Sequence, residues 1–187
     1  MAVNSFMVPL GTPAPDFRLT DIEGGTVSLA DLKGRPATLV IFLSNHCPYV
    51  RHIEQGLGAL SADYADTVSI VGICSNDVDR YPEDDVAHLT EQAKRAGFRF
   101  PYLIDETQEV AKAYRAACTP DFFLYDADLK LAYRGEFDGA RPRNDVPVTG
   151  SSLRAAIDAV LAGRPVEAEQ RPSLGCGIKW KPGNEPA

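Results

Sequence analysis

Apolar runs alternate with amphipathic stretches through most of this chain. Two of the runs are short and almost continuously apolar, as in strands that are buried on both faces of a parallel sheet. In the stretches between them, apolar residues recur at helical spacing. In chain order the sequence predicts a strand at 38–43, a helix at 48–64, a strand at 68–74, a helix at 82–96, a strand at 102–104 and a helix at 106–116. This alternation predicts a parallel sheet covered by helices on both faces, with a ligand site at the carboxyl ends of its strands.

Turn-rich segments flank this alternating core. Three prolines exclude helix from residues 1–16, and a glycine turn at 23–25 joins two short strands into a hairpin. Beyond the core, apolar strands on either side of 126–128 form a second, antiparallel hairpin, and a last helix is predicted at 152–162. The residues from 164 to 187 are rich in proline and glycine, and we expect them to wrap over the body or to be mobile.

Length and composition fit a single domain. With 187 residues the chain can bury a full core, so we expect residues 1–163 to form one domain and residues 164–187 to follow as a tail. The net charge of −7 speaks against nucleic acid or an anionic membrane surface as a partner. The N-terminus lacks the charged and apolar regions of a signal peptide, and no run has the length of a membrane span. We therefore expect a cytoplasmic protein.

The most informative stretch is 44–50, where the first strand of the core meets its helix. Cys47 lies at this junction, and Pro48 suits the first helical position because its missing N–H would be unpaired there. Free backbone N–H groups and the helix dipole stabilise a thiolate, and such sites lower a cysteine pKa from about 8.5 to roughly 3.5–7.5. His46 lowers the Cys47 pKa further if it is protonated nearby, or else it faces solvent. We predict that Cys47 is a reactive nucleophile and not an ordinary buried cysteine.

Further motifs accompany this junction. They are residues 11–17 with the glycine hairpin after them, the strand that leads into Ser44 and Cys47, and the Thr119-Pro120 pair that precedes another strand. Together they resemble the thioredoxin-like proteins grouped with alkyl hydroperoxide reductase and thiol-specific antioxidant, over roughly residues 9–162. This resemblance implies a thioredoxin-like α/β fold with a central mixed sheet flanked by helices, an N-terminal β-hairpin extension and a C-terminal tail.

The resemblance also implies a site and an activity. It leads us to expect a cis peptide bond at Pro120 that lies against the sulfur of Cys47, and a peroxiredoxin-like reduction of peroxides without a cofactor or a metal. The expected substrate-binding residues are Ser44, His46, Pro48, Tyr49, Thr119 and Pro120.

Two departures from related proteins keep a second activity open. A thioredoxin-type disulfide reductase has another cysteine three residues after the first, where this chain has Val50. A typical peroxiredoxin has a proline where Val40 stands. It also has an arginine near the sulfur, for which Arg51, Arg115 and Arg134 are the candidates. Peroxide reduction is our main hypothesis, and thiol–disulfide exchange without a Cys-x-x-Cys motif is the alternative.

Both activities begin with attack by the Cys47 thiolate. A peroxide gives a sulfenic acid and a disulfide gives a mixed disulfide, and each product needs a second thiol. Cys118 is the first candidate because it lies two residues before Pro120; Cys176 on the glycine-flanked tail is the second, and an external thiol is the third. Cys74 ends a buried strand and is expected to pack in the core. The expected partners are a small-molecule peroxide, or a protein or low-molecular-weight disulfide, and an external thiol reductant.

Two other classes of protein fit the sequence less well. A copper or zinc site could draw on His46, Cys47, His52, Cys118 and Cys176, but no pair has a standard zinc-finger spacing. A thioredoxin-like interaction module without catalysis would carry the same fold, because a fold does not determine a function. Metal analysis tests the first class and thiol titration tests the second. The sequence leaves the electron donor and the oligomeric state open, a homodimer included.

Overall fold

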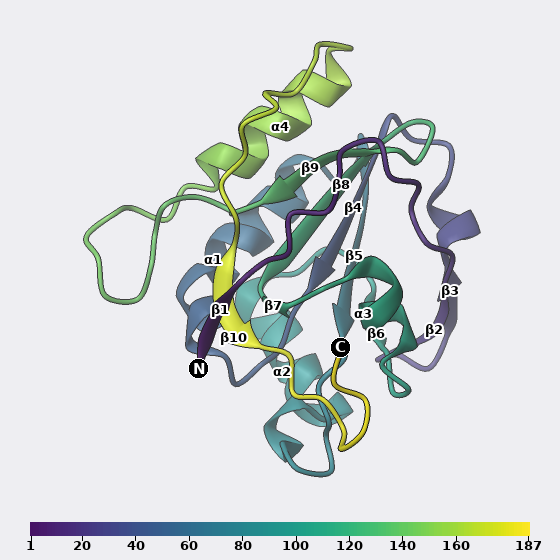
Figure 1. The fold of residues 1–187 in the computed structure, drawn as a ribbon, viewed down its shortest axis with the longest axis vertical. Helices are drawn as coiled ribbons and strands as arrows, with labels where there is room; N and C mark the ends of the chain where they lie inside the picture. The colour runs from purple at the N-terminus through teal and green to yellow at the C-terminus, as the bar shows by residue number, and fades with distance from the viewer.

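A mixed sheet of seven strands lies at the centre of the computed structural model, which describes all residues from 1 to 187. Its strands are β2 (Arg18–Asp21), β3 (Thr26–Ser28), β4 (Ala37–Phe42), β5 (Val68–Cys74), β6 (Tyr102–Ile104), β8 (Asp121–Asp126) and β9 (Leu131–Gly135). Their order across the sheet is β3-β2-β6-β5-β4-β8-β9 (Figure 1). Strands β4, β5 and β6 are parallel and the other neighbours are antiparallel, which confirms the thioredoxin-like mixed sheet.

Different helices cover the two faces of this sheet. They are α1 (Pro48–Asp63), α2 (Val86–Ala96), α3 (Glu109–Tyr114) and α4 (Ser151–Leu161), with short 3-10 helices at Leu29–Leu32 and Pro82–Asp84. Leu39 and Ile41 of β4 belong to the core cluster of α1, α2 and α4, whereas Val40 and Phe42 belong to the cluster of α3. Successive side chains of a strand point to opposite faces, so β4 contributes to both cores. None of the helices is long and apolar enough to cross a membrane.

Two of the predicted helices are shorter in the structure than in the sequence pattern. The segment predicted at 82–96 divides into a 3-10 turn and α2, because the carboxylate of Asp85 accepts a hydrogen bond from the backbone N–H of His88 and so starts the helix there. The helix predicted at 106–116 is reduced to α3, since Gln108 and Arg115 at its ends have positive φ angles of 66° and 56°.

Close packing seats α2 against α1. A side chain at Gly58 of α1 would place its Cβ 1.8 Å from the carbonyl oxygen of Ala96, at the end of α2. The glycine therefore lets the two backbones touch. This contact matters for the site, because Gln92 of α2 donates a hydrogen bond of 3.0 Å to the carbonyl of Ser44, just before Cys47.

Segments near the two ends of the chain form a second sheet together with a short strand from the middle of the chain. Its strands are β1 (Ala2–Asn4), β7 (Cys118–Thr119) and β10 (Leu174–Gly177), in the order β1-β10-β7 and all antiparallel. Figure 1 shows β10, in yellow, beside β1 at the N-terminus. Residues of the predicted C-terminal tail thus form the middle strand of this second sheet, and residues of the predicted N-terminal arm form one of its edge strands.

Candidate thiol site

Cys47 occupies the junction between the central sheet and the first long helix. It is the residue that caps the N-terminus of α1, and Pro48 is the first residue of that helix. The strand β4 ends at Phe42, so the sulfur lies at the carboxyl end of a central strand, as predicted. Cys47 is fully buried, with 0% of its surface exposed. A substrate can therefore reach the sulfur only if something that covers it moves.

The loop of Thr119 and Pro120 lies directly against this sulfur. The Cys47 thiol donates a hydrogen bond of 3.1 Å to the carbonyl oxygen of Thr119, and the Thr119–Pro120 peptide bond is cis, as expected. The hydroxyl of Thr119 lies 3.0 Å from the hydroxyl of Ser44. When Ser44 donates in this pair, the Thr119 hydroxyl is free to donate to the sulfur. The structure thus brings Ser44, Thr119 and Pro120 together around Cys47.

Cys176 is the second thiol at the site. Strand β10 pairs with β7 so that Cys176 stands opposite Thr119. Because the carbonyl oxygen of Thr119 accepts the hydrogen bond of the Cys47 thiol, this pairing brings Cys176 beside the nucleophile, close enough to change its ionisation. Cys176 itself is half-buried, and both thiols are free. The structure therefore places the tail cysteine, our second candidate for the resolving thiol, next to the nucleophile.

The pKa values of the two thiols are shifted in opposite directions. The pKa of Cys47 is lowered to about 6, chiefly because the Cys176 thiol donates to the thiolate. Burial opposes ionisation, while the Thr119 hydroxyl and the backbone N–H of Val50 in the first turn of α1 favour it. The helix N-terminus contributes as predicted, but less than Cys176. The same hydrogen bond raises the pKa of Cys176, because its proton is held by the neighbouring anion.

Alkylation of the reduced protein by iodoacetamide should select Cys47 and follow its ionisation. We expect the rate to rise with pH through a midpoint of about 6 and then to level off, because only the thiolate reacts. Burial raises the pKa of Cys74 and of Cys118, so neither should react in the folded protein. Peptide mapping after timed quenching measures each rate. A midpoint near the ordinary value of about 8.5 would contradict the proposed hydrogen bond.

Cys118 lies on the same short strand as Thr119 but has a different environment. It is fully buried, and its thiol donates a hydrogen bond of 3.6 Å to the carbonyl of Pro120. Neighbouring side chains of a strand point to opposite sides. The Cys118 side chain therefore points away from the side of the strand on which the Thr119 side chain lies. Proximity along the sequence to Pro120 therefore does not make Cys118 the nearer partner of the nucleophile.

A buried carboxylate, Asp84, organises the loop that leads into Cys47. It accepts hydrogen bonds from the backbone N–H groups of Asn45 and His46, from the imidazole Nδ1 of His46 at 2.6 Å, and from the side-chain amide of Asn76 at 2.9 Å. The His46 ring also stacks on Tyr81, with the ring centres 5.5 Å apart. His46 is thus held by Asp84 and not by the sulfur. Asp84 carries no distinctive signal in the sequence, because an acidic residue at a helix start needs no further explanation.

Exchange of Asp84 for asparagine should destabilise the protein and change the titration of His46. The NH₂ group of the new side chain would face two groups that are themselves donors, the His46 imidazole and the Asn76 amide. We therefore expect a loss of about 2–4 kcal/mol in the free energy of unfolding, measured in urea. The hydrogen bond that the His46 imidazole donates to Asp84 raises the pKa of His46. Burial alone would raise the pKa of Asp84, but the bonds from His46 and Asn76 lower it. The pair therefore stabilises the fold fully between about pH 4 and pH 6.5.

Outside this window the stabilisation of the pair is lost in both directions. It decreases as pH falls through the folded pKa of Asp84 and as pH rises through the folded pKa of His46. In the Asp84→Asn protein we expect the His46 pKa, measured by NMR, to fall toward its ordinary value. A variant at the exposed Asp85, which binds His88 in the same way, is the matched control. Equal stability of the Asp84→Asn and Asp85→Asn proteins would contradict this role.

Arginine does not stabilise the Cys47 sulfur in this structure. Arg51 donates to the backbone carbonyl and the side chain of Asn45, and Arg134 donates to the carbonyl of Val8 and to Gln170. Arg115 is exposed at the end of α3. The three candidate arginines are thus engaged elsewhere or point to solvent, and the donors at the sulfur are neutral groups.

The other predicted residues fall into different surroundings. Tyr49 and Pro120 line a cavity of ≈ 10 Å³ together with Ser173 of the tail, while Pro48 is exposed. A space of this size holds no more than about one water molecule. No group of three or more histidine, cysteine or carboxylate side chains is arranged to hold a metal ion, so the five residues considered for copper or zinc are not gathered.

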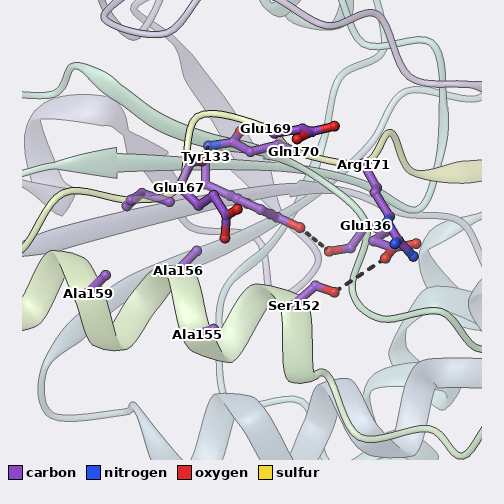
Figure 2. A pocket seen from close by; sticks show the side chains of 11 residues that line it. Tyr133, Glu136, Ser152, Ala155, Ala156, Ala159, Glu167, Glu169, Gln170 and Arg171 are labelled. Atoms are coloured by element: carbon purple, nitrogen blue, oxygen red, sulfur yellow. Dashed lines mark hydrogen bonds between the residues drawn. The ribbon is translucent and has the colours of Figure 1, made fainter.

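A wider groove lies between α4, β9 and residues 166–171. It measures ≈ 370 Å³, and Figure 2 shows Glu136 at one end of it, beside Ser152. The Ser152 hydroxyl donates to Glu136 at 3.3 Å, and the Tyr133 hydroxyl donates to the Glu136 carbonyl at 2.6 Å. None of the four cysteines lines this groove. The groove is thus separate from the thiol site, where the tail covers the sulfur.

The fold and the paired thiols together define a thioredoxin-like protein with a thiol-based redox site. The chain belongs to the AhpC/TSA family, whose profile matches residues 10–134. The thiol-disulfide oxidoreductase ResA of Bacillus anthracis is 30% identical over 123 residues, which are 65% of this chain and 66% of that protein. The match thus spans just under two thirds of the relative's length.

Solved structures agree with this assignment. The crystal structure of an uncharacterized conserved protein from Geobacillus kaustophilus is 54% identical, covers 98% of each chain and has a TM-score of 0.95. A thiol:disulfide interchange protein DsbE from Chlorobium tepidum is 22% identical, covers 82% of this chain and 98% of its own, and has a TM-score of 0.65. The second likeness shows the fold alone.

Proposed function

We propose that this protein is a thiol–disulfide oxidoreductase in which Cys47 is the nucleophile and Cys176 is the resolving cysteine. The observation that carries the proposal is the pairing of β10 with β7, which sets Cys176 opposite Thr119, the residue whose carbonyl oxygen accepts a hydrogen bond of 3.1 Å from the Cys47 thiol. A thiol in this position favours the ionisation of Cys47, and its position next to the nucleophile supports Cys176 as the partner in a disulfide. A resolving cysteine on the C-terminal tail takes the place of the missing second cysteine of a Cys-x-x-Cys motif.

The reaction proceeds in two exchanges. The Cys47 thiolate attacks one sulfur of the substrate disulfide, and the other sulfur leaves as a thiolate that takes a proton from water. The product is a mixed disulfide on Cys47. The Cys176 thiolate then attacks the Cys47 sulfur, the second substrate sulfur leaves, and a Cys47–Cys176 disulfide forms. An external thiol reductant returns both cysteines to thiols.

The order of these exchanges follows from the pKa values of the two thiols. In the reduced protein the Cys47 thiolate holds the proton of Cys176 and raises its pKa. Once Cys47 is part of a mixed disulfide it carries no charge, so that cause disappears and Cys176 can ionise. Cys176 thus becomes a nucleophile only after Cys47 has reacted.

The substrate class is argued from two observations. The relative named thiol-disulfide oxidoreductase supports a disulfide, and the lack of an arginine at the sulfur removes a feature expected for a peroxidase. Peroxide reduction is the second candidate, because the chain belongs to the AhpC/TSA family and a polar hydroxyl, that of Thr119, favours the thiolate and lies 3.0 Å from the hydroxyl of Ser44. In that case Cys47 sulfenic acid would condense with Cys176 and release water.

One experiment separates these functions. Reduced protein is mixed in a stopped-flow instrument with oxidised glutathione, with a protein disulfide or with hydrogen peroxide, and the fluorescence of the single tryptophan, Trp180 on the tail, reports the reaction. We expect a disulfide to react faster than it does with free cysteine, and non-reducing peptide mapping to recover a Cys47–Cys176 disulfide. A peroxide rate far above the disulfide rate would favour the second candidate. No reaction faster than that of free cysteine would overturn both.

A further inference from the structure

One buried side chain binds both the tail after Cys176 and the acidic residue that organises the loop before Cys47. It is Asn76, which lies in the loop after β5 and is 7% exposed. Its side-chain oxygen accepts a hydrogen bond of 2.9 Å from the backbone N–H of Lys179. Its side-chain nitrogen donates a hydrogen bond of 2.9 Å to the carboxylate of Asp84. Asn76 thus bridges the C-terminal tail and Asp84.

Asp84 extends this bridge to the residues just before the nucleophile. It is 0% exposed, and its two oxygens have different partners. Oδ2 accepts from Asn76, whereas Oδ1 accepts from the backbone N–H groups of Asn45 at 2.7 Å and His46 at 3.1 Å. An unbroken series of hydrogen bonds therefore runs from the backbone three residues after Cys176 to the backbone one residue before Cys47.

A contact between side chains joins the same two segments by a second route. The ammonium group of Lys179 lies 5.7 Å from the ring centre of Tyr81, and the Tyr81 ring stacks on the imidazole of His46. Both Lys179 and Tyr81 are partly exposed. A cation over an aromatic ring at such a position contributes less than a buried hydrogen bond to a carboxylate. The buried amide of Asn76 is therefore the stronger of the two links.

The bridge requires an amide at position 76. A carboxylate only accepts hydrogen bonds and a backbone N–H only donates them, so the bridging group must donate to Asp84 and accept from Lys179. The two ends of an asparagine side chain do this at a fixed separation. An aspartate would set a second carboxylate against Asp84, and an alanine would lose both bonds. The identity of residue 76 thus determines whether the two segments are joined.

We propose that Asn76 is a positioning residue for the second exchange, in which Cys176 attacks the mixed disulfide on Cys47. This inference rests on the function proposed above. In that exchange a bond forms between the two protein sulfurs, the bond from Cys47 to the substrate sulfur breaks, and the substrate leaves as a thiolate with the electron pair. Asn76 binds neither sulfur. It holds their two segments in register and so raises the effective concentration of one thiol at the other.

The test measures this effective concentration in the full chain. The unaltered protein and Asn76→Ala are equilibrated with mixtures of reduced and oxidised glutathione without oxygen, quenched with acid and alkylated. Peptide mapping gives the fraction with a Cys47–Cys176 disulfide. We expect the equilibrium constant for that disulfide to be about tenfold smaller in Asn76→Ala, because a small displacement of reacting groups costs this much or more. The reduction potential is then about 30 mV higher.

The ionisation of Cys47 gives a second measurement on the same variant. Cys176 is the largest cause of the lowered Cys47 pKa. If Asn76→Ala holds Cys176 less firmly, the Cys47 pKa should rise from about 6, as followed by the pH dependence of alkylation. A loss of stability alone would move neither this pKa nor the equilibrium constant, because the thiol and disulfide forms compared are both folded.

Ser75→Ala is the matched control, because it removes a buried hydrogen bond from the neighbouring residue. Ser75 is 4% exposed, and its hydroxyl donates at 2.7 Å to Asp105. Neither end of that bond belongs to the bridge. The control should lose stability in urea but keep the equilibrium constant and the Cys47 pKa of the unaltered protein.

Asn76→Asp is a second variant that keeps the size of the side chain, in case Asn76→Ala does not fold. It retains an acceptor for the N–H of Lys179 but loses the bond to Asp84. If the bridge positions the thiols, this variant should also form the disulfide with an equilibrium constant several times smaller than that of the unaltered protein.

The outcomes separate the positioning role from the proposed function. Equal equilibrium constants in the unaltered protein and in the folded variants of Asn76 would overturn the positioning role, and so would an equal decrease in Ser75→Ala. If the Cys47–Cys176 disulfide still formed and turnover still required both cysteines, the proposed function would stand. Absence of that disulfide from the unaltered protein at every glutathione ratio would overturn the function, and the positioning role with it.

Discussion

Exchange of Cys176 for alanine is expected to stop turnover after a single attack. The first exchange can still occur, but the mixed disulfide on Cys47 then has no neighbouring thiol to resolve it. We expect the steady-state rate to fall by at least about a hundredfold, because resolution must wait for an external thiol at low effective concentration. Intact-mass measurement should show the substrate attached to nearly every protein molecule.

Cys176 also lowers the pKa of Cys47, and a serine variant separates this role from the resolution of the mixed disulfide. Alanine removes the donor that is the largest cause of the lowered Cys47 pKa, so that pKa should rise from about 6. The hydroxyl in Cys176→Ser can still donate to the thiolate, so its Cys47 pKa should rise less. Both variants should accumulate the mixed disulfide. Cys118→Ala is the matched control, and accumulation in that variant instead would identify Cys118 as the resolving thiol.

Exchange of Cys47 for serine is expected to abolish the activity altogether. A serine hydroxyl does not ionise near neutral pH, and no histidine or carboxylate in the structure binds this position as a general base. The rate of disulfide reduction should therefore fall by at least about a thousandfold, to the level of uncatalysed exchange. The measurement is the consumption of a protein disulfide in the presence of an external thiol reductant.

A change at another buried cysteine distinguishes loss of chemistry from loss of fold. Cys74 is as deeply buried as Cys47, at 2% exposure, and ends the neighbouring strand β5. Cys74→Ser should retain the activity while it loses some stability, because a hydroxyl replaces a thiol in an apolar site. If Cys47→Ser kept the rate of the unaltered protein, the assignment of the nucleophile would be wrong.

The elements of the core could be predicted because each depends on nearby residues. The apolar runs of β4 and β5 and the helical spacing after Pro48 are local signals, and so is the position of Cys47 between them. The ends of α2 and α3 could not be predicted as well. They depend on capping by Asp85 and on the backbone of Gln108, which hydrogen-bonds to the tail through its side chain.

The position of Cys176 shows what local reasoning misses. Distance along the chain favoured Cys118, since it lies two residues from Pro120. Pairing of β10 with β7 brings Cys176 to the sulfur from more than a hundred residues away in sequence, and no periodicity in the tail announces that strand. Asp84 was missed for a similar reason, because its partners Asn45, His46 and Asn76 come from two other loops.

The sequence by itself determined the alternating core, the cysteine at a helix N-terminus and the proline loop, since these follow from patterns within a few residues. Only the tertiary structure decided which thiol meets that cysteine, what lowers its pKa and what covers it. Each of these depends on a strand from the end of the chain that pairs with the edge of β7, and pairing between distant segments is a property of the folded backbone.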